Sequence, residues 1–312
     1  MRLLPFRGGR RPSRHASTRL GSVSPEVLRA VRRIQIRANR LLSNRFLGEY
    51  HSVFKGHGIE FQETREYQPG DDERTIDWNV TARTGVPHVK KYVEERELVV
   101  LLLVDVSASL NFGSVHRTKR DVAAEIAAVL ALAATRNNDR VGLIAFTDRI
   151  EYYLPPRKGT QHVLRLVREL LQLEPAGSGT DLAAALRFLN KVQRRRAVVF
   201  VLSDFMATGY EPALRVSALR HDVTALSLAD PRELELPPVG LIELEDAESG
   251  RLVLVDASEA ETRRQYRIAA IRDFEERQRT FRTIGIDEVA LRTDRPYLPL
   301  LLQHFNLRAR RF

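Results

Sequence analysis

The chain has 312 residues, of which 43% are hydrophobic and 29% charged, and it contains no cysteine. This length and composition suit one large domain or two ordinary domains, and they exclude a disordered or collagen-like chain. Without cysteine the chain has no disulfide, thiolate zinc site, iron–sulfur cluster or cysteine nucleophile, so any metal must be held by oxygen or imidazole.

The net charge of +10 is concentrated at the start of the chain. Residues 1–40 hold eleven Lys and Arg and one acid, Glu26, whereas the remainder is balanced. A basic segment on a neutral body fits a solvated tail. It also fits a surface from Arg2 to Arg40 that contacts anionic membrane, RNA or an acidic partner. A fold devoted to nucleic acid is not expected.

Because no apolar run reaches about 18 residues and no secretory signal is evident, we expect a cytoplasmic protein, or one peripheral at the inner membrane.

Residues 1–42 are predicted to form a basic N-terminal arm and an amphipathic helix. Ser24, Pro25 and Glu26 supply a helix start. One face of the helix that follows is apolar and carries Val27, Leu28, Val31, Ile34 and Leu41. We expect this face to pack against the body, with a membrane surface as the alternative.

Two further regions follow. Residues 43–97 are rich in glycine, aromatic and charged residues and predict a β-rich subdomain. Residues 98–312 open with the aliphatic run 98–104 and then alternate strands and helices, which predicts an α/β fold with a doubly wound, mostly parallel sheet of Rossmann type. A β-hairpin insertion is expected near 238–256, followed by a charged helix over 259–283, a strand at 288–291 and a helix near 297–305.

Oxygen-bearing side chains follow the predicted strands where those strands end. Asp105, Ser107 and Ser109 follow the first run, and Asp204 closes the strand at 197–203. Between them, the loop 177–181 places Thr180 at a helix start. Since ligands of open α/β sheets bind beyond the carboxyl ends of the strands, we expect these side chains to meet.

The expected donor set suits Mg²⁺, with Mn²⁺ or Ca²⁺ as alternatives, because these cations prefer oxygen ligands. If the hydroxyls of Ser107, Ser109 and Thr180 bind directly and the carboxylates act through water, the ion keeps a strong positive field for an incoming acid. Ser178 or Asp181 could replace Thr180 as ligand or helix cap, and the serines could merely cap a helix that begins near Ser114.

The strand-end residues resemble the metal-ion-dependent adhesion site of von Willebrand factor A domains. The segments Gly56 to Phe61, Arg65 to Trp78 and Ala82-Arg83 are similar to the hallmark block of the bacterial DUF58 family. This resemblance, from about Ser43 onward, implies a von Willebrand factor A-like domain that works with a MoxR-type AAA+ ATPase as adaptor in chaperone-like maturation or remodelling of an unnamed client protein. Many relatives carry N-terminal membrane spans, which this sequence does not show.

Within the hallmark block, Arg65, Arg74 and Arg83 alternate with Asp71, Asp72 and Asp77, and we expect a structural network of ion pairs under Trp78.

Phosphate-binding, metalloprotease and nucleophile-elbow motifs are not found, so we expect no enzymatic activity. The alternative is a Mg²⁺-dependent phosphohydrolase, which would need a cation such as Lys119 or Arg140 aimed at the metal. The sequence alone does not show whether Lys119 or Arg140 reaches the metal site.

Overall fold

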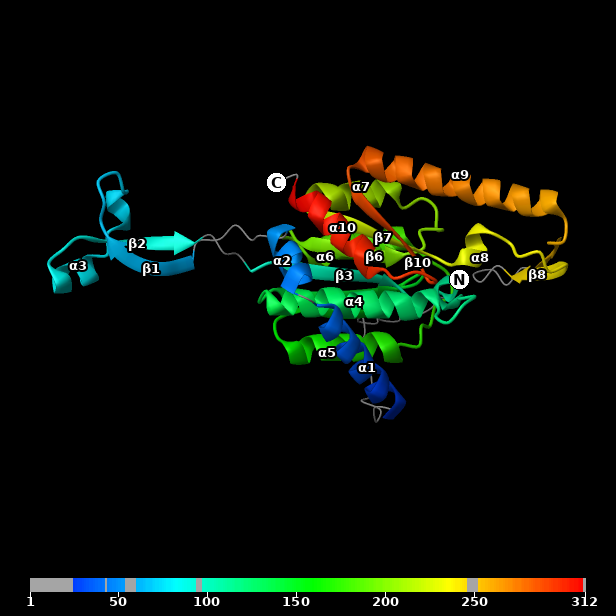
Figure 1. Cartoon of the computed structure of the whole chain (residues 1–312), viewed down its shortest axis with the longest axis horizontal. Coiled ribbons are helices and arrows are strands. Elements are labelled where there is room, and N and C mark those ends of the chain that lie inside the picture. Colours follow the sequence, from blue (N-terminus) through cyan, green and yellow to red (C-terminus); the bar gives the residue numbers. More distant parts are fainter. Residues whose placement is uncertain (1–24, 43, 54–59, 94–96, 246–251, 311–312) are drawn as a thin grey trace, which may run out of the picture.

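The computed structural model describes residues 25–42, 44–53, 60–93, 97–245 and 252–310. The arm 1–23, residues 56–59 of the hallmark block and the hairpin turn 247–250 lie outside these ranges. Figure 1 shows a central α/β body with one projection at each end, a β-arm on the left and a β-hairpin on the right. None of the described helices is both long enough and apolar enough to cross a bilayer.

A six-stranded sheet with the order β10-β7-β6-β3-β4-β5 forms the centre of the body. All neighbours are parallel except β4 and β5, which are antiparallel. The chain therefore leaves β3 on one side toward β4 and returns on the other side as β6, which places the topological switch point between β3 and β6. The strands are β3 (Val99–Asp105), β4 (Arg140–Phe146), β5 (Ile150–Arg157), β6 (Val198–Ser203), β7 (Asp222–Ala229) and β10 (Asp287–Arg292).

The expected α/β class with a doubly wound, mostly parallel sheet is confirmed. The sequence reading missed β5, which carries Pro155 and Pro156. Proline lacks the N–H that a central ladder needs and is tolerated at a sheet edge, which is where β5 lies.

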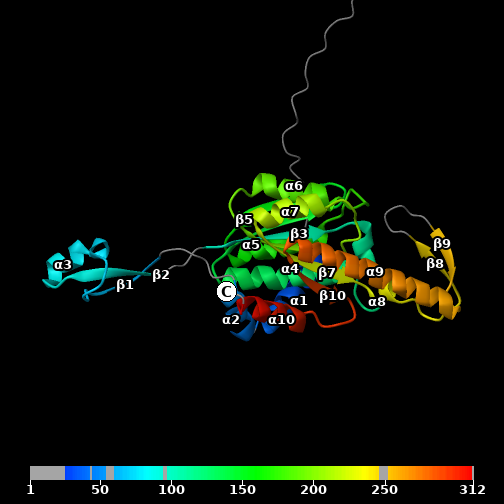
Figure 2. The ribbon, with the colours of Figure 1, turned by 90° about the horizontal axis from the view of Figure 1, so that it is seen from above.

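Helices cover both faces of the sheet, as Figure 2 shows from above. Because successive side chains of a strand point to opposite faces, Val100 and Leu102 of β3 join one core and Leu101 and Leu103 join the other. The first core is covered by α1 (Pro25–Leu41), α2 (Asn44–Val53), α4 (Lys119–Arg136), α5 (Thr160–Gln172) and α10 (Leu298–Ala309). The second is covered by α6 (Leu182–Val192), α7 (Glu211–Arg220) and α9 (Ala260–Ile284).

The β-arm consists of β1 (Glu60–Glu66) paired antiparallel with β2 (His88–Val93), with η1 (Glu73–Thr75) and α3 (Trp78–Thr84) between them. The expected ion pair is present at Arg65 and Asp71, whose side chains share two hydrogen bonds of 2.9 and 2.6 Å. Asp72 and Asp77 cap η1 and α3. Trp78 is 69% exposed, so its indole is not packed over a buried network as expected.

Residues 44–53, which the composition grouped with the β-rich region, form helix α2. Its Phe46 and Tyr50 are fully buried, and both rings make edge contacts with Phe305 of α10 at centroid distances of 5.5 and 5.9 Å. This helix therefore belongs to the core of the α/β body. At the other end of the molecule, the expected hairpin is present as β8 (Leu241–Glu245) and β9 (Leu252–Asp256).

Candidate functional site

The candidate site lies at the switch point, where β3 and β6 end. Asp105 is the last residue of β3, and the loop after it turns into the short helix η2 (Ala108–Asn111). Asp204 follows the last residue of β6. Because β3 and β6 are parallel neighbours, their carboxyl ends place these two aspartates side by side.

A chain of hydrogen bonds connects four of the five expected residues. The backbone N–H of Ser107 donates to Oδ1 of Asp105 at 2.9 Å, and the hydroxyls of Ser107 and Ser109 are 3.2 Å apart. The hydroxyl of Ser109 donates to Oδ2 of Asp204 at 2.8 Å. Residues nearly a hundred positions apart in sequence are thus in direct contact.

Thr180 approaches the same place on a separate loop. The backbone N–H of Ala108 donates to the carbonyl of Ser178 at 3.1 Å, which fixes the loop of Thr180 against the loop of Asp105. Asp181 caps helix α6 by accepting from the N–H of Ala184 at 2.7 Å, so Thr180 is not the helix cap. The serine motif does not cap α4 either, because Thr118 does so in a capping box with Asp121.

The five residues of the site differ in their exposure to solvent. Asp105 and Ser107 are fully buried and Asp204 is nearly so, whereas Ser109 and Thr180 are half-buried.

Ser203 is a member of the site that the sequence reading did not single out. Its buried hydroxyl donates to Oδ2 of Asp105 at 2.6 Å and accepts from the N–H of Phe205 at 3.1 Å. Phe205 has a φ of 55°, a left-handed backbone that non-glycine residues rarely adopt. Such strain persists only where the surroundings impose it, and it is frequent at functional sites. The Ser-Asp sequence at the end of a buried strand was the available signal.

A buried cation is the second unexpected feature of the site. The ammonium of Lys119, which is fully buried, lies 2.8 Å from Oδ2 of Asp204 and 2.6 Å from Oε1 of Glu233. Burial disfavours the ammonium, but the two carboxylates outweigh it and raise the pKa of Lys119. Arg140, the other candidate cation, lies at the start of β4 and pairs with Glu97, away from the site.

Glu233 is brought to Lys119 by the end of β7. Asp230 follows that strand and caps α8 (Pro231–Leu234) in a capping box with Glu233. The carboxylate of Asp230 also accepts from the N–H of Ser114 at 2.9 Å and from the hydroxyl of Thr293 at 2.7 Å. Three adjacent strand ends are thus joined through one lysine.

The surroundings of Asp105 disfavour the charged form of its carboxyl group. Burial and the facing carboxylate of Asp204 raise the pKa of Asp105 to about 7. In the described part of the chain no three carboxylate or imidazole side chains cluster as a metal centre. A cation here would therefore depend on hydroxyl oxygens together with two carboxylates, and this donor set fits a hard divalent ion such as Mg²⁺.

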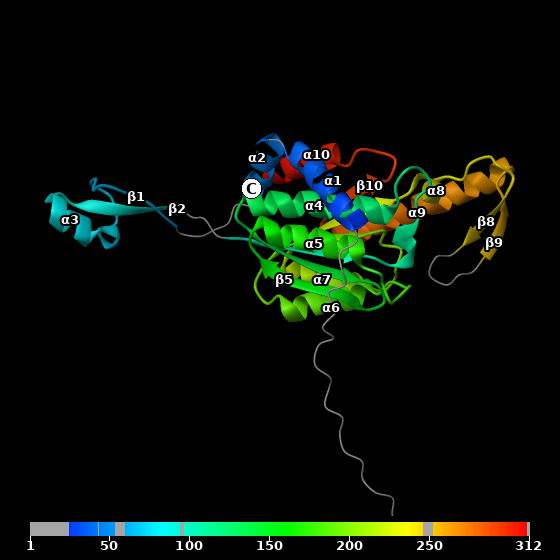
Figure 3. The same cartoon turned by 90° about the horizontal axis from the view of Figure 1, so that it is seen from below.

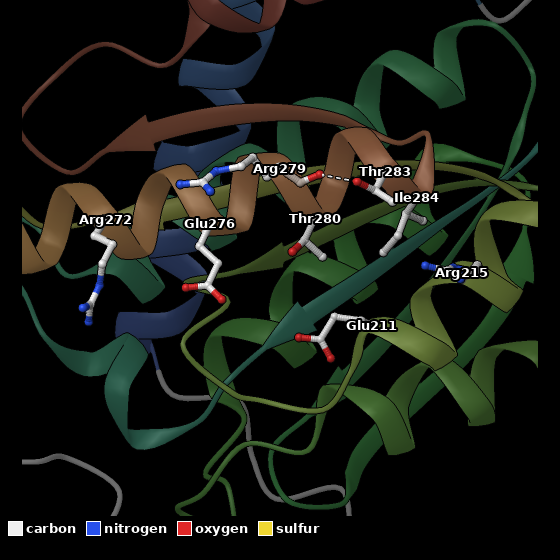
Figure 4. A pocket seen from close by; sticks show the side chains of 8 residues that line it. All are labelled: Glu211, Arg215, Arg272, Glu276, Arg279, Thr280, Thr283 and Ile284. Atoms are coloured by element: carbon white, nitrogen blue, oxygen red, sulfur yellow. Dashed lines mark hydrogen bonds between the residues drawn. The ribbon is translucent and has the colours of Figure 1, made fainter.

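A groove between α7 and α9 is separate from this site (Figure 4). It has a volume of about 580 Å³, and three arginines, Arg215, Arg272 and Arg279, alternate along it with Glu211 and Glu276. None of the five expected site residues lines it. The mixed charges leave little net attraction for an ion of either sign.

The six-stranded, mostly parallel sheet with an antiparallel edge strand and helices on both faces defines a doubly wound α/β protein. The sequence profile of the family described as "Protein of unknown function DUF58" matches residues 63–276. The chain is 36% identical over 289 residues to the uncharacterized protein Rv1480 of Mycobacterium tuberculosis, covering 92% of this chain and 91% of that protein. The chain belongs to the DUF58 family.

The comparison with solved structures finds an aerotolerance-related membrane protein from Bacteroides fragilis. It is 17% identical, with a TM-score of 0.46, and the match covers 69% of this chain and 100% of that one. The SpRpn10 VWA domain is 12% identical, with a TM-score of 0.37 and coverage of 67% and 95%.

Proposed function

We propose that this protein is a non-enzymatic interaction module that docks an acidic side chain of a partner on a divalent cation. The cation would be Mg²⁺, with Mn²⁺ or Ca²⁺ as alternatives, held by Asp105, Ser107, Ser109, Thr180 and Asp204. The observation that carries this proposal is the hydrogen-bond chain from Asp105 through Ser107 and Ser109 to Asp204, which gathers oxygen donors from two strand ends. A bound ion would supply an electropositive docking point for a carboxylate.

The residues around a bound ion would leave most of its positive charge uncompensated. Ser107, Ser109 and Thr180 contribute neutral hydroxyls, and the charge of Asp204 is already shared with the ammonium of Lys119. An ion with few anionic ligands retains affinity for a foreign carboxylate. The half-buried hydroxyls of Ser109 and Thr180 mark the side from which that carboxylate would approach.

Two exposed apolar residues flank the site and favour a protein partner over a small anion. Met206, two residues after Asp204, is 65% exposed, and Phe112, three residues after Ser109, is 43% exposed. Methionine and aromatic residues are enriched in protein interfaces. A partner would bury them around its docked acid.

Membership of the DUF58 family supports the expectation that this partner is a MoxR-type AAA+ ATPase. The ATPase would supply the ATP hydrolysis, and this chain would act as its adaptor in chaperone-like maturation or remodelling of a client.

The phosphohydrolase alternative is not favoured by the position of Lys119. Its ammonium is fully buried and bonded to both Asp204 and Glu233. A lysine that stabilises a transferring phosphoryl group must be free to contact it. Here both carboxylates would have to be displaced first.

The experiment is affinity purification of the tagged full chain from its native extract, in Mg²⁺ and in EDTA. We expect an AAA+ ATPase to co-elute in Mg²⁺ only. Ser107→Ala and Thr180→Ala should abolish this recovery while circular dichroism and melting temperature stay unchanged. Ser178→Ala is the matched control, because Ser178 lies on the same loop with an exposed side chain and uses only its carbonyl.

Recovery of the ATPase in both eluates would show an interface that needs no cation and would overturn the docking mechanism. Equal loss with Ser178→Ala would mean that the loop shape, and not the Thr180 hydroxyl, is recognised. Phosphatase turnover that depends on Asp105 would favour the enzyme instead.

A further inference from the structure

Helix α1 lies on the outside of the body with one face committed to packing. Val31, Ile34 and Leu41 pack against the core, and Ala38 is completely buried. Figure 3 shows the helix lying across α4 and α5. The apolar stripe that the sequence left open to a membrane is therefore covered by the protein itself.

The opposite face of α1 combines arginines with exposed aliphatic side chains. Leu28, which the sequence pattern placed on the apolar face, is instead 53% exposed, and Ile36 is 47% exposed. A turn of 3.6 residues puts Leu28, Arg32 and Ile36 in one row, with further arginines in the neighbouring row. The outward-facing arginines of the helix, all exposed, are Arg29, Arg32, Arg33 and Arg40. No acidic residue occurs from Val27 to Leu42.

Acidic groups on the neighbouring helices are already engaged. Glu125 of α4 is buried and holds Arg37, Arg117 and the hydroxyl of Tyr297. Glu169 of α5 is 2.7 Å from Arg168. Arg32, Arg33 and Arg40 are not among the arginines that these two carboxylates bind.

We infer that the outer face of α1 binds the surface of an anionic phospholipid bilayer. Arginines beside a membrane are attracted by its negative surface potential, and aliphatic side chains among them add apolar burial in the headgroup region. Nucleic acid would use the arginines but gain nothing from Leu28 and Ile36, whose exposure favours lipid. The seventeen residues of α1 provide about 25 Å of helix to lie on such a surface.

The sequence ahead of α1 has the same chemistry. Residues 1–24 contain six arginines and no acid, together with Leu3, Leu4 and Phe6. Juxtaposed basic and apolar residues are typical of segments that bind anionic lipid. The inference is independent of the cation site and is tested in EDTA, so that failure of either proposal leaves the other standing.

The experiment is co-sedimentation of the full chain with vesicles of phosphatidylcholine containing 30% phosphatidylglycerol, and with pure phosphatidylcholine. We expect salt-sensitive binding to the anionic vesicles only. Because each basic residue near such a surface contributes roughly a fivefold factor, Arg32→Gln/Arg33→Gln/Arg40→Gln should weaken binding by at least about tenfold. Arg267→Gln/Arg272→Gln/Arg279→Gln, on exposed positions of α9, removes the same charge and should bind as the parent does.

A second variant separates lipid from other polyanions. Leu28→Ser/Ile36→Ser should weaken binding to anionic vesicles several-fold and leave binding to single-stranded RNA unchanged. Three results would overturn the inference: equal losses in the α1 and α9 triple variants, no loss in the α1 triple variant, or vesicle binding unaffected by the serine variant.

Discussion

The ammonium of Lys119 lies 2.8 Å from Oδ2 of Asp204, and neither side chain has more than 4% of its surface exposed. The pair links helix α4 to the end of β6, at the place where the sheet reverses its strand order. An ion pair buried this deeply is costly unless the remaining donors of the ammonium also find partners, and here Glu233 accepts from the same ammonium.

Replacing Lys119 should therefore destabilise the fold strongly. Lys119→Met leaves Asp204 and Glu233 facing each other without a cation, and we expect a loss of about 3 to 5 kcal/mol in the free energy of unfolding. Lys119→Met/Glu233→Gln should recover part of this loss because one of the buried charges is gone. Urea denaturation followed by circular dichroism measures both; a loss below about 1 kcal/mol for Lys119→Met would contradict the account.

Ser203 should influence the cation site without being one of its expected ligands. Ser203→Ala removes the 2.6 Å hydrogen bond that orients Asp105, and such supporting bonds are worth about 10- to 100-fold in metal affinity. We expect weaker Mn²⁺ binding in titration calorimetry, by about tenfold. Ser227→Ala is the matched control, because Ser227 pairs with Ser203 across β6 and β7 and bonds to Glu288 instead. Equal affinity in the two variants would remove Ser203 from the site.

Gly177 should be intolerant of any side chain. A Cβ at this position would overlap the side chains of Asp148 and Thr147. We expect Gly177→Ala to destabilise by about 1 to 3 kcal/mol, as overpacking does, and to displace the loop that carries Thr180. Gly48→Ala provides the contrast, since nothing lies within 4 Å of its Cβ in helix α2; it should stabilise by up to about 1 kcal/mol. Thermal unfolding of both variants checks the difference in sign.

His221 should make stability depend on pH. Burial, followed by the charges of Arg220 and Arg196, lowers the pKa of this 2% exposed imidazole below its usual 6.5. The unfolded chain then binds the proton more readily than the folded one, so stability falls as the pH drops below about 6.5. We expect His221→Leu to lose less stability between pH 7 and pH 5.5 than the parent. The same pH slope in both proteins would exclude His221 as its source; His116→Gln, at an exposed position, controls for the loss of an imidazole.

The spacing of hydrophobic residues along the chain predicted much of the architecture. The uninterrupted aliphatic run that became β3 and the regular alternation after it predicted a buried parallel sheet between helix layers. The same logic located Asp105 and Asp204, because a carboxylate that ends a buried strand stands out from the residues before it. The sequence analysis missed strand β5, because its two prolines interrupt the alternation of apolar and polar residues that identifies a strand.

The sequence by itself determined the fold class, the hairpin, the long terminal helices and the order of oxygen donors along the chain, because these depend on local spacing and hydrophobic pattern. Only the tertiary structure decided which charges meet. It brought Lys119 to Asp204 and Glu233, Ser203 to Asp105, and the apolar face of α1 onto α4 and α5. Contacts between residues about 85 to 115 positions apart follow from strand order and helix packing, and no local pattern along the chain encodes them.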